Sequence, residues 1–236
     1  MYAFIVSAYV SIRAVAVSVI IPTLNEQETI AASIDAARAA GAAEVIVTDG
    51  GSNDDTISIA TSRGARVITG ERLRAAQINR GIGAAAHDTI IVVHADTRLP
   101  EGAADAVEQA LSGGAIFGGF RAAFIEGGPR LAYVAFMINA RTRLTRKPWG
   151  DQAQFARRET LLRAGGYPPF PIMEDYELAR RMKRMGRVAC LPLTVRTSGR
   201  RFLARGVIRT SIVNWLIIGA YHLGVSPEKL ARWYRA

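Results

Sequence analysis

Short runs of β-branched apolar residues alternate with longer segments of helical periodicity through the first half of the 236-residue chain. Such runs predict buried strands, and the longer segments predict helices that each present one apolar face. The expected strands are one that ends at Pro22, Glu44–Thr48, Arg66–Thr69 and Thr89–His94, and the helices between them are Gln27–Ala40, Asp55–Arg63 and Leu73–Ala86. This alternation predicts an α/β fold with a Rossmann-like, mostly parallel central sheet flanked by helices.

The second half of the chain has a less regular pattern. The expected strands are Ala115–Ile125, Gln152–Arg157 and Val188–Val195, and the expected helices are Pro100–Leu111, Leu131–Leu144, Arg158–Ala164 and Glu174–Met185. No internal repeat and no low-complexity linker divides the chain. We therefore predict one domain over residues 1–209, followed by a C-terminal helical extension over residues 210–236.

The extension begins with a stretch without charged residues, Thr210–Pro227, which is expected to be mostly helical. Three interpretations remain open. The helix could pack on the domain, it could lie in a membrane interface, or it could span a membrane. Its apolar content is thin for a span. Trp215, Tyr221 and the arginines that precede the stretch favour the interfacial interpretation over the span.

The positive charge is concentrated in the same part of the chain. The formal net charge is +10, and between Leu178 and Pro227 there are ten basic residues but no Asp or Glu. A bias toward arginine in the genome is one explanation of the excess. The clustering nevertheless predicts a positive field near one end of the molecule, which suits diphosphates or an anionic membrane surface.

Two further features bear on the compartment. The single cysteine, Cys190, excludes internal disulfides and cysteine-rich metal sites, which fits a reducing compartment. Met1–Ile12 is apolar but has no basic flank and is too short to span a bilayer, so a frayed strand or terminal extension is expected rather than a signal peptide. We expect a cytoplasmic protein, with peripheral association at the inner face of the membrane as a variant.

Polar and acidic residues follow three of the predicted strands. The first strand ends in Pro22-Thr-Leu-Asn-Glu26, the second in Asp49-Gly-Gly-Ser-Asn-Asp-Asp-Thr56, and the third in His94-Ala-Asp96. Open α/β sheets bind ligands outside the carboxyl ends of their strands. The sequence therefore predicts one crevice that collects these three loops.

These motifs, together with Met173-Glu-Asp-Tyr-Glu-Leu178, resemble those of the family 2 glycosyltransferases, which have the GT-A fold. The resemblance extends from Ser18 to about Arg209, and the segments around Gly150-Asp-Gln152 look most like a small bacterial subgroup. It implies transfer of a sugar from a nucleoside-diphosphate sugar to an acceptor hydroxyl, with inversion at the anomeric carbon. A lipid-linked acceptor is one option, and the hexosyltransferase type is expected.

The resemblance implies a donor site built from several loops. The candidate nucleotide-sugar contacts are Pro22, Thr23, Asn25, Glu26, Asp49, Gly50, Arg74, Gln77, Asn79, His94, Ala95, Asp96, Asp151, Arg200 and Arg201. Asp49 could instead cap its own turn, but Ser52 or Asn53 can supply that cap and leave Asp49 free. Arginines at 200 and 201 suit phosphate oxygens because the guanidinium donates in a fork.

His94-Ala95-Asp96 occupies the position of the family's metal-binding Asp-x-Asp motif and departs from it at the first residue. Asp96 remains a suitable ligand for Mg²⁺ or Mn²⁺, the cofactor that the resemblance implies. His94 could bind Mn²⁺, contact the nucleotide or only fill space.

Glu174 and Asp175 form the expected catalytic pair. The resemblance makes Asp175 the base that takes the acceptor proton, and Glu174 a contact of the acceptor or donor sugar. Acids at a helix start also occur there because the helix dipole favours them. Glu177 is expected to face away from the site and to pair with Arg180 or Arg181.

Other functions fit less well. Gly81-Ile-Gly83-Ala-Ala-Ala86 matches a dinucleotide fingerprint in form, but it ends a helical segment and precedes a strand. A nucleotidyltransferase would need a glycine-rich basic loop after the first strand. Nucleic-acid binding has only charge in its favour, so no nucleic-acid partner is expected. The main alternative is a degenerate GT-A domain that binds a nucleotide or an anionic membrane without turnover, which His94 would permit.

Overall fold

The computed structural model describes residues 16–235. The expectation for Met1–Ile12 lies outside these residues. The eight strands within this range form one sheet in the order β3-β2-β1-β4-β7-β6-β8-β5. They are β1 (Val17–Thr23), β2 (Glu44–Asp49), β3 (Arg66–Thr69), β4 (Thr89–Val92), β5 (Thr97–Arg98), β6 (Phe117–Phe124), β7 (Gln154–Arg157) and β8 (Val188–Thr197). The α/β class predicted from the alternating pattern is confirmed.

The sheet is parallel where the sequence pattern is regular and mixed where it is not. Strands β3, β2, β1 and β4 are parallel to one another. Strand β7 then runs antiparallel to both β4 and β6, while β6 and β8 are parallel and the two-residue β5 is antiparallel to β8.

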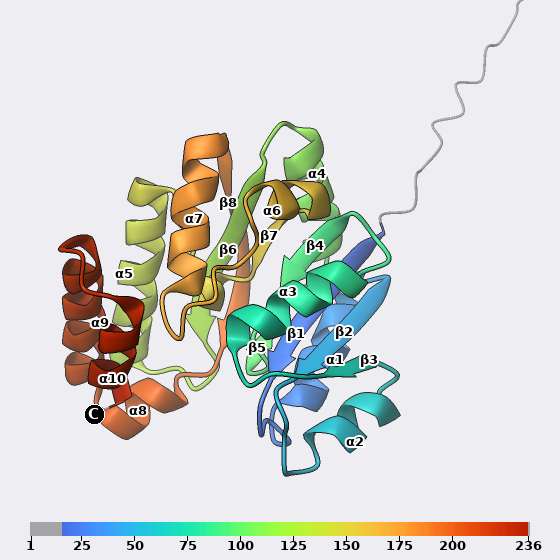
Figure 1. Cartoon of the computed structure of the whole chain (residues 1–236), viewed down its shortest axis with the longest axis horizontal. Coiled ribbons are helices and arrows are strands. Elements are labelled where there is room, and N and C mark those ends of the chain that lie inside the picture. The colour runs from blue at the N-terminus through green and yellow to red at the C-terminus, as the bar shows by residue number, and fades with distance from the viewer. Residues whose placement is uncertain (1–15, 236) are drawn as a thin grey trace, which may run out of the picture.

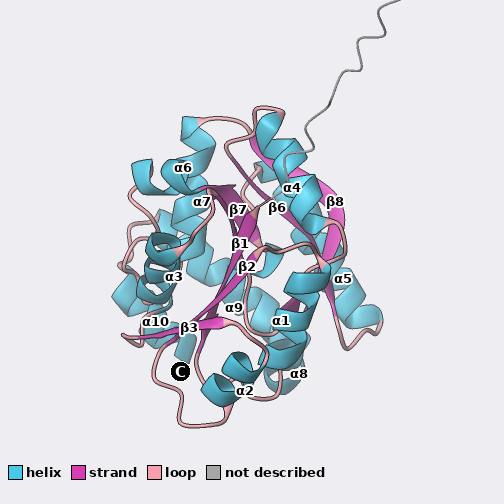
Figure 2. Cartoon of the chain, turned by 90° about the vertical axis from the view of Figure 1, so that its right-hand side faces the viewer, coloured by secondary structure: helices cyan, strands magenta, loops and turns pink. Residues whose placement is uncertain are grey.

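Helices cover both faces of the sheet, and Figures 1 and 2 show the strands between two helical layers. The ten helices within the described residues are α1 (Ile30–Ala39), α2 (Thr56–Ser62), α3 (Arg74–Ala84), α4 (Ala103–Ser112), α5 (Pro129–Thr145), α6 (Arg158–Arg163), α7 (Glu174–Met185), α8 (Arg200–Arg205), α9 (Val207–His222) and α10 (Pro227–Arg235). A 3₁₀ turn, η1 (Gly150–Gln152), precedes β7. The sequence pattern missed β5 and α8, whereas α10 falls within the extension that was expected to be helical.

The core consists of one apolar cluster on each face of the sheet. On one face, helices α1, α2 and α4 pack against the odd-numbered residues of β1, such as Val19 and Ile21. On the other face, Ile20 of β1 packs with α3, α6 and α7. This alternation follows from the two-residue period of a strand. It explains why β1 is buried along its whole length.

Close approach of α3 to the sheet depends on Gly81. A Cβ at this position would lie 2.5 Å from Cγ2 of Ile20. A real Cβ does not approach another carbon so closely, so only glycine allows α3 to pack here. Gly81 therefore serves helix packing, whereas a Cβ at Gly83 would meet no atom within 4 Å. Both glycines lie near the end of α3, and the strand–turn–helix context of a dinucleotide fingerprint is not present.

The C-terminal extension packs beside the domain. Met173 and Tyr176 of the α7 region form a small apolar cluster with Ile217 of α9 and Leu230 of α10. Helix α9 also contacts α5, and the two helices lie side by side in Figure 1. Among residues 16–235, no helix is both long enough and apolar enough to cross a membrane.

Candidate active site

The loops after β1 and β2 hold each other in place. Asp49 is fully buried and its carboxylate accepts hydrogen bonds from the N–H groups of Gly51 and Ser52, each at 2.8 Å. The hydroxyls of Thr23 and Ser52 donate to the same carboxylate at 3.2 and 2.5 Å. Asp49 therefore makes the turn cap itself. The expectation that Ser52 or Asn53 would do so and leave Asp49 free is wrong.

Asn25 points into the same pair of loops. Its φ of 54° is in the left-handed region, where asparagine is one of the few tolerated residues. Its N–H donates to Ser52 Oγ at 2.9 Å, and its side-chain oxygen accepts from the N–H of Asn53 at 2.9 Å. Pro22 is buried within β1. Pro22, Thr23 and Asn25 thus shape the loop, and their side chains are engaged within the protein.

Two amides that were expected to face the donor lie inside the structure. Gln77 is buried, and its Nε2 donates to the carbonyl oxygens of Thr23 and Thr48 at 2.6 and 2.9 Å. Asn79 donates to the carbonyl of Tyr167 at 2.7 Å and accepts from its N–H at 2.9 Å. The side chains of Gln77 and Asn79 therefore organise backbone near the crevice, and the structure differs here from their predicted role as ligand contacts. Gly50 lies against Gln77, whose Nε2 would be 2.9 Å from an added Cβ.

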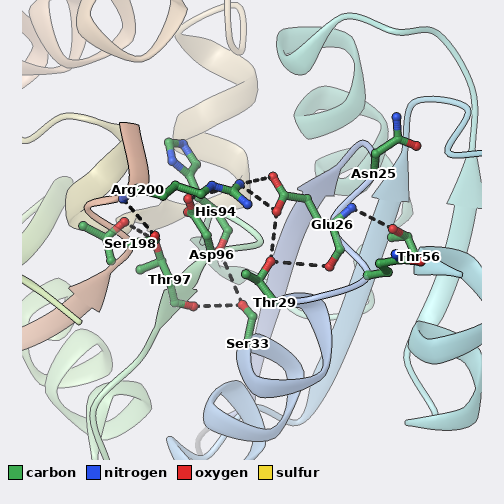
Figure 3. A network of polar contacts seen from close by, with 12 residues as sticks. Asn25, Glu26, Thr29, Ser33, Thr56, His94, Asp96, Thr97, Ser198 and Arg200 are labelled. Carbon is green, nitrogen blue, oxygen red and sulfur yellow. Dashed lines mark hydrogen bonds and ion pairs between the residues drawn. The ribbon is translucent and has the colours of Figure 1, made fainter. Parts of the chain in front are cut away.

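A charged cluster joins the loops after β1 and β4 to the start of α8 (Figure 3). Arg200 Nη2 donates to both carboxylate oxygens of Glu26, at 2.5 and 2.7 Å, and lies 3.5 Å from Oδ2 of Asp96. Burial raises the pKa of Asp96, and the charge of Arg200 opposes this. Ala95, between His94 and Asp96, is buried. Three segments that lie far apart in sequence thus meet as expected.

His94 and Asp175 meet at the backbone of Gly150. The N–H of Gly150 donates to Oδ2 of Asp175 at 2.6 Å. A Cβ on Gly150 would lie 2.6 Å from Nε2 of His94 and 3.0 Å from Oδ2 of Asp175, so both side chains lie close to Gly150. Burial lowers the pKa of His94 to about 3, with a further contribution from the charge of Arg74. The imidazole is therefore neutral at neutral pH.

The first turn of α7 also carries a buried carboxylate, Glu174. Oε1 of Glu174 accepts a hydrogen bond from Nε of Arg74. The other oxygen, Oε2, is buried without a hydrogen-bond partner among the described residues. The charge of Glu174 raises the pKa of Arg74. Glu177, one turn later, pairs with Arg180 and Arg181 at 2.7 and 3.1 Å, as predicted. Helix α7 thus directs Glu174 and Asp175 toward the crevice and Glu177 away from it.

The 3₁₀ turn beside Asp175 adds polar atoms that the sequence did not reveal. The guanidinium of Arg141 lies 3.3 Å from the ring centroid of Trp149. Nε1 of Trp149 and Oδ1 of Asp151 are both buried, with no hydrogen-bond partner among the described residues. Such unpaired buried groups are uncommon and call for an explanation, because each costs about 1–3 kcal/mol. Trp149 precedes the noted Gly-Asp-Gln segment directly, whereas nothing in the sequence marked Arg141.

Burial raises the pKa of Asp151 from 3.8 to about 6, and the charge of Arg141 only partly offsets this. The folded-state pKa lies above the unfolded one, so the resulting stabilisation is complete below about pH 4 and is lost as pH rises through 6. Replacing Asp151 with Asn is therefore expected to stabilise the protein by about 1–3 kcal/mol at pH 8 and to have little effect at pH 4. Chemical denaturation at the two pH values measures this difference. A variant less stable than the wild type at pH 8 would contradict it.

Asp96 has the chemistry of a divalent-cation ligand. Among residues 16–235, no group of three or more His, Cys, Asp or Glu side chains could hold a metal ion by itself. Mg²⁺ is commonly held by one or two carboxylates together with phosphate oxygens of the substrate. Asp96, a carboxylate without a direct side-chain hydrogen bond from the described residues, fits a site of that kind when a diphosphate supplies further oxygens.

The C-terminal segment contacts residues beside the candidate site. Nη1 of Arg201 donates to the hydroxyl of Tyr234 at 2.8 Å, and its positive charge acts on His94, lowering the pKa of His94. The hydroxyl of Tyr176, next to Asp175, is 2.6 Å from Nε2 of His222 at the end of α9. The extension therefore contacts both the basic loop and the helix that carries the acidic pair.

Comparison with known proteins gives one family. Residues 18–165 match the sequence model described as glycosyl transferase family 2. Among solved structures, TarS of S. aureus has a TM-score of 0.62 at 17% identity, and the alignment covers 78% of this chain but only 36% of TarS. Glucosyl-3-phosphoglycerate synthase from Mycobacterium tuberculosis, solved with phosphoglyceric acid, has a TM-score of 0.55 at 25% identity, over 76% of this chain and 70% of that one. No curated protein sequence matches the chain.

The mycobacterial synthase has also been solved with Mn²⁺, uridine diphosphate and glucosyl-3-phosphoglycerate. That structure has a TM-score of 0.57 at 23% identity and covers 85% of this chain and 78% of the other. These likenesses establish a common GT-A fold. The matched family segment includes the loops after β1, β2 and β4, and it ends before α7.

Proposed function

Because the chain belongs to glycosyltransferase family 2, we propose that it transfers a sugar from a nucleoside-diphosphate sugar to an acceptor hydroxyl. The observation that supports this proposal is that Asp96 lies 3.5 Å from Arg200, while His94, two residues before it, and Asp175 both lie close to Gly150. A sugar transferase must neutralise a diphosphate leaving group and deprotonate the attacking hydroxyl. The crevice brings groups suited to both tasks together.

The donor diphosphate is proposed to bind beside Asp96 and Arg200. The guanidinium of Arg200 now pairs with Glu26, and phosphate oxygens would compete for the same donors. Mg²⁺ or Mn²⁺, held by Asp96 and the diphosphate, would supply positive charge against the negative charge that develops on the leaving group. Arg201, the next residue of α8, would add a second positive charge beside the diphosphate. The loops organised by Asp49 and Asn25 would then receive the nucleoside.

Asp175 is proposed as the general base. Its Oδ2 already accepts a hydrogen bond from the N–H of Gly150, which fixes the carboxylate next to neutral His94. A base on the side of the sugar opposite the diphosphate would take the proton of the acceptor during direct displacement, which inverts the anomeric carbon. Arg74 holds Glu174 beside it, leaving Oε2 of Glu174 to accept from a substrate hydroxyl.

The acceptor is proposed to lie against the 3₁₀ turn. Oδ1 of Asp151 can accept a hydrogen bond and Nε1 of Trp149 can donate one, and both are unpaired in the described structure. An acceptor that carries several hydroxyl groups would satisfy both. This also gives a reason for a buried carboxyl at position 151, whose ionisation lowers the stability of the fold, since binding sites often retain polar groups that do not stabilise the fold.

A thermal-shift panel of nucleoside diphosphates with and without Mn²⁺ tests donor binding. A nucleotide at 100 times its dissociation constant adds about 2.7 kcal/mol, or roughly 5–10 °C for a chain of this size. We expect such a shift for one base with Mn²⁺ and a much smaller one without it. Replacing Asp96 with Asn should remove the increment due to Mn²⁺.

The matched control is Asp88→Asn, since Asp88 is an exposed carboxylate directly before the opposite end of β4. It should keep the Mn²⁺-dependent shift. An unchanged shift in the Asp96 variant would remove Asp96 as the ligand, and no shift with any nucleoside diphosphate would contradict the proposed donor. Shifts without sugar release from a donor and acceptor panel would instead favour a domain that binds without turnover.

A further inference from the structure

Helix α9 has an apolar stripe that the described part of the domain does not cover. Ile208, Ile212, Trp215 and Leu216 are between 54% and 76% exposed. Their spacing of four, three and one residues places them on one face of the helix. Ile217, which packs against α7 and α10, lies on another face. The helix is thus attached to the domain on one side and presents large apolar side chains to solvent on another.

Helix α5 has a second stripe of the same kind. Tyr133, Phe136, Met137 and Leu144 are between 39% and 83% exposed and also share one helix face. Helices α5 and α9 contact each other. Most exposed large apolar residues of the described structure lie on α5, α8, α9 and α10, and only Leu162, Met185 and Leu223, which directly follows α9, lie elsewhere. We call the eight side chains of these two stripes the α5–α9 face.

The charged side chains of α5, α8 and α9, the helices that form and adjoin the α5–α9 face, are all positive. Helix α5 contains Arg130, Arg141 and Arg143 but no acid, and the chain from 179 to 226 has no Asp or Glu. Arg143 and Arg209 are exposed and adjoin Leu144 and Ile208 in sequence. Apolar side chains bordered by arginines are the pattern of helices that lie in the interface of an anionic membrane.

We propose that the α5–α9 face docks the protein onto an anionic lipid bilayer, with both helices lying along the surface. A second copy of the chain is disfavoured as the occupant, because a two-fold contact would bring the same arginines together across the interface. Helix α9 also reaches the first turn of α7, since Nε2 of His222 lies 2.6 Å from the hydroxyl of Tyr176 and Tyr221 donates to Glu177 at 2.8 Å. Docking would therefore hold the first turn of α7 near the lipid surface.

Co-sedimentation of the full chain with vesicles tests the proposal. We expect binding to vesicles of phosphatidylcholine with phosphatidylglycerol, weaker binding at high salt, and little binding to phosphatidylcholine alone. Replacing Trp215 and Leu216 with Ser should reduce the partition coefficient at least about tenfold. Removing the charges of Arg143 and Arg209 should reduce it roughly fivefold for each residue.

Leu162→Ser is the matched control, because Leu162 is 56% exposed on α6, away from the face. It should leave the partition unchanged. If the substitutions at Trp215 and Leu216 unfold α9, the test is repeated on α5 by replacing Tyr133 and Phe136 with Ser. The proposal would be overturned if the protein bound neutral vesicles equally well or bound neither kind of vesicle. It would also be overturned if analytical ultracentrifugation showed a dimer that the Trp215 and Leu216 substitutions dissociate. Donor binding is measured separately and does not depend on its outcome.

Discussion

Replacing Asp175 with Asn is expected to lower the rate of sugar transfer by about 10²–10⁴-fold, the usual contribution of a general base. The amide oxygen of Asn can still accept the hydrogen bond from the N–H of Gly150, so the backbone around η1 should keep its position. The amide cannot take a proton from the acceptor. Affinity for the nucleoside diphosphate should change by no more than about threefold, because this side chain is proposed to act on the acceptor.

Release of nucleoside diphosphate from a panel of sugar donors, with water or an added hydroxyl compound as acceptor, measures this loss. Asp105→Asn is the matched control, since Asp105 holds a first-turn position on α4 but is exposed. It should leave the rate unchanged. Turnover by the Asp175 variant within threefold of wild type would remove Asp175 from the role of base.

Replacing Gly150 with Ala should cause the second large loss. The new Cβ would lie 2.6 Å from Nε2 of His94 and 3.0 Å from Oδ2 of Asp175, so at least one of these groups has to move. A displacement of about 1 Å at a catalytic group can cost about 10²-fold in rate. Overpacking of this kind typically costs about 1–3 kcal/mol of stability. We expect a folded but less stable protein with at least tenfold lower activity.

Gly83 provides the comparison for this substitution. An added Cβ at Gly83 meets no atom within 4 Å, and the residue lies within α3. Gly83→Ala should leave activity unchanged and should raise stability by up to about 1 kcal/mol through helix propensity. Activity and urea unfolding of the two variants are measured side by side. Normal turnover in the Gly150 variant would show that His94 and Asp175 tolerate displacement, against the proposed geometry.

The positions of the loops could be predicted from the sequence because parallel strands share one polarity. Once β1, β2 and β4 are recognised as buried parallel strands, the segments after them must emerge at the same edge of the sheet. The same reasoning places Glu26 and Asp96 close together. Arg200 pairs with Glu26 and lies 3.5 Å from Asp96, and its contact with a diphosphate stays a prediction. Antiparallel β7 was harder to foresee, since a strand pattern of four residues does not determine direction.

The roles of individual polar side chains were less predictable. Asp49, Gln77 and Asn79 all lie near the crevice, yet each is bonded to backbone groups that the fold would otherwise leave unsatisfied. Composition does not distinguish a buried amide that bonds backbone from one that bonds ligand. One signal was present for Gln77. It precedes Gly81 by four residues and so shares the helix face that approaches β1.

Contacts made by the extension were outside the reach of local pattern. Tyr176 meets His222 across 46 positions of sequence, and Arg201 meets Tyr234 across 33. No periodicity or motif encodes such pairs, because they depend on how α9 and α10 fold back onto α7 and α8. The apolar helix itself was predicted, and its exposed stripe became apparent only when the packed side was known.

The crystal structure of the protein with a nucleoside diphosphate and Mn²⁺ would show whether Asp96, Arg200 and Asp175 belong to one site for sugar transfer. We expect the diphosphate beside Asp96 and Arg200, Mn²⁺ bound to Asp96, and the carboxylate of Asp175 facing the space that the sugar would occupy. A nucleotide bound elsewhere, or one whose diphosphate lies away from both Asp96 and Asp175, would contradict it.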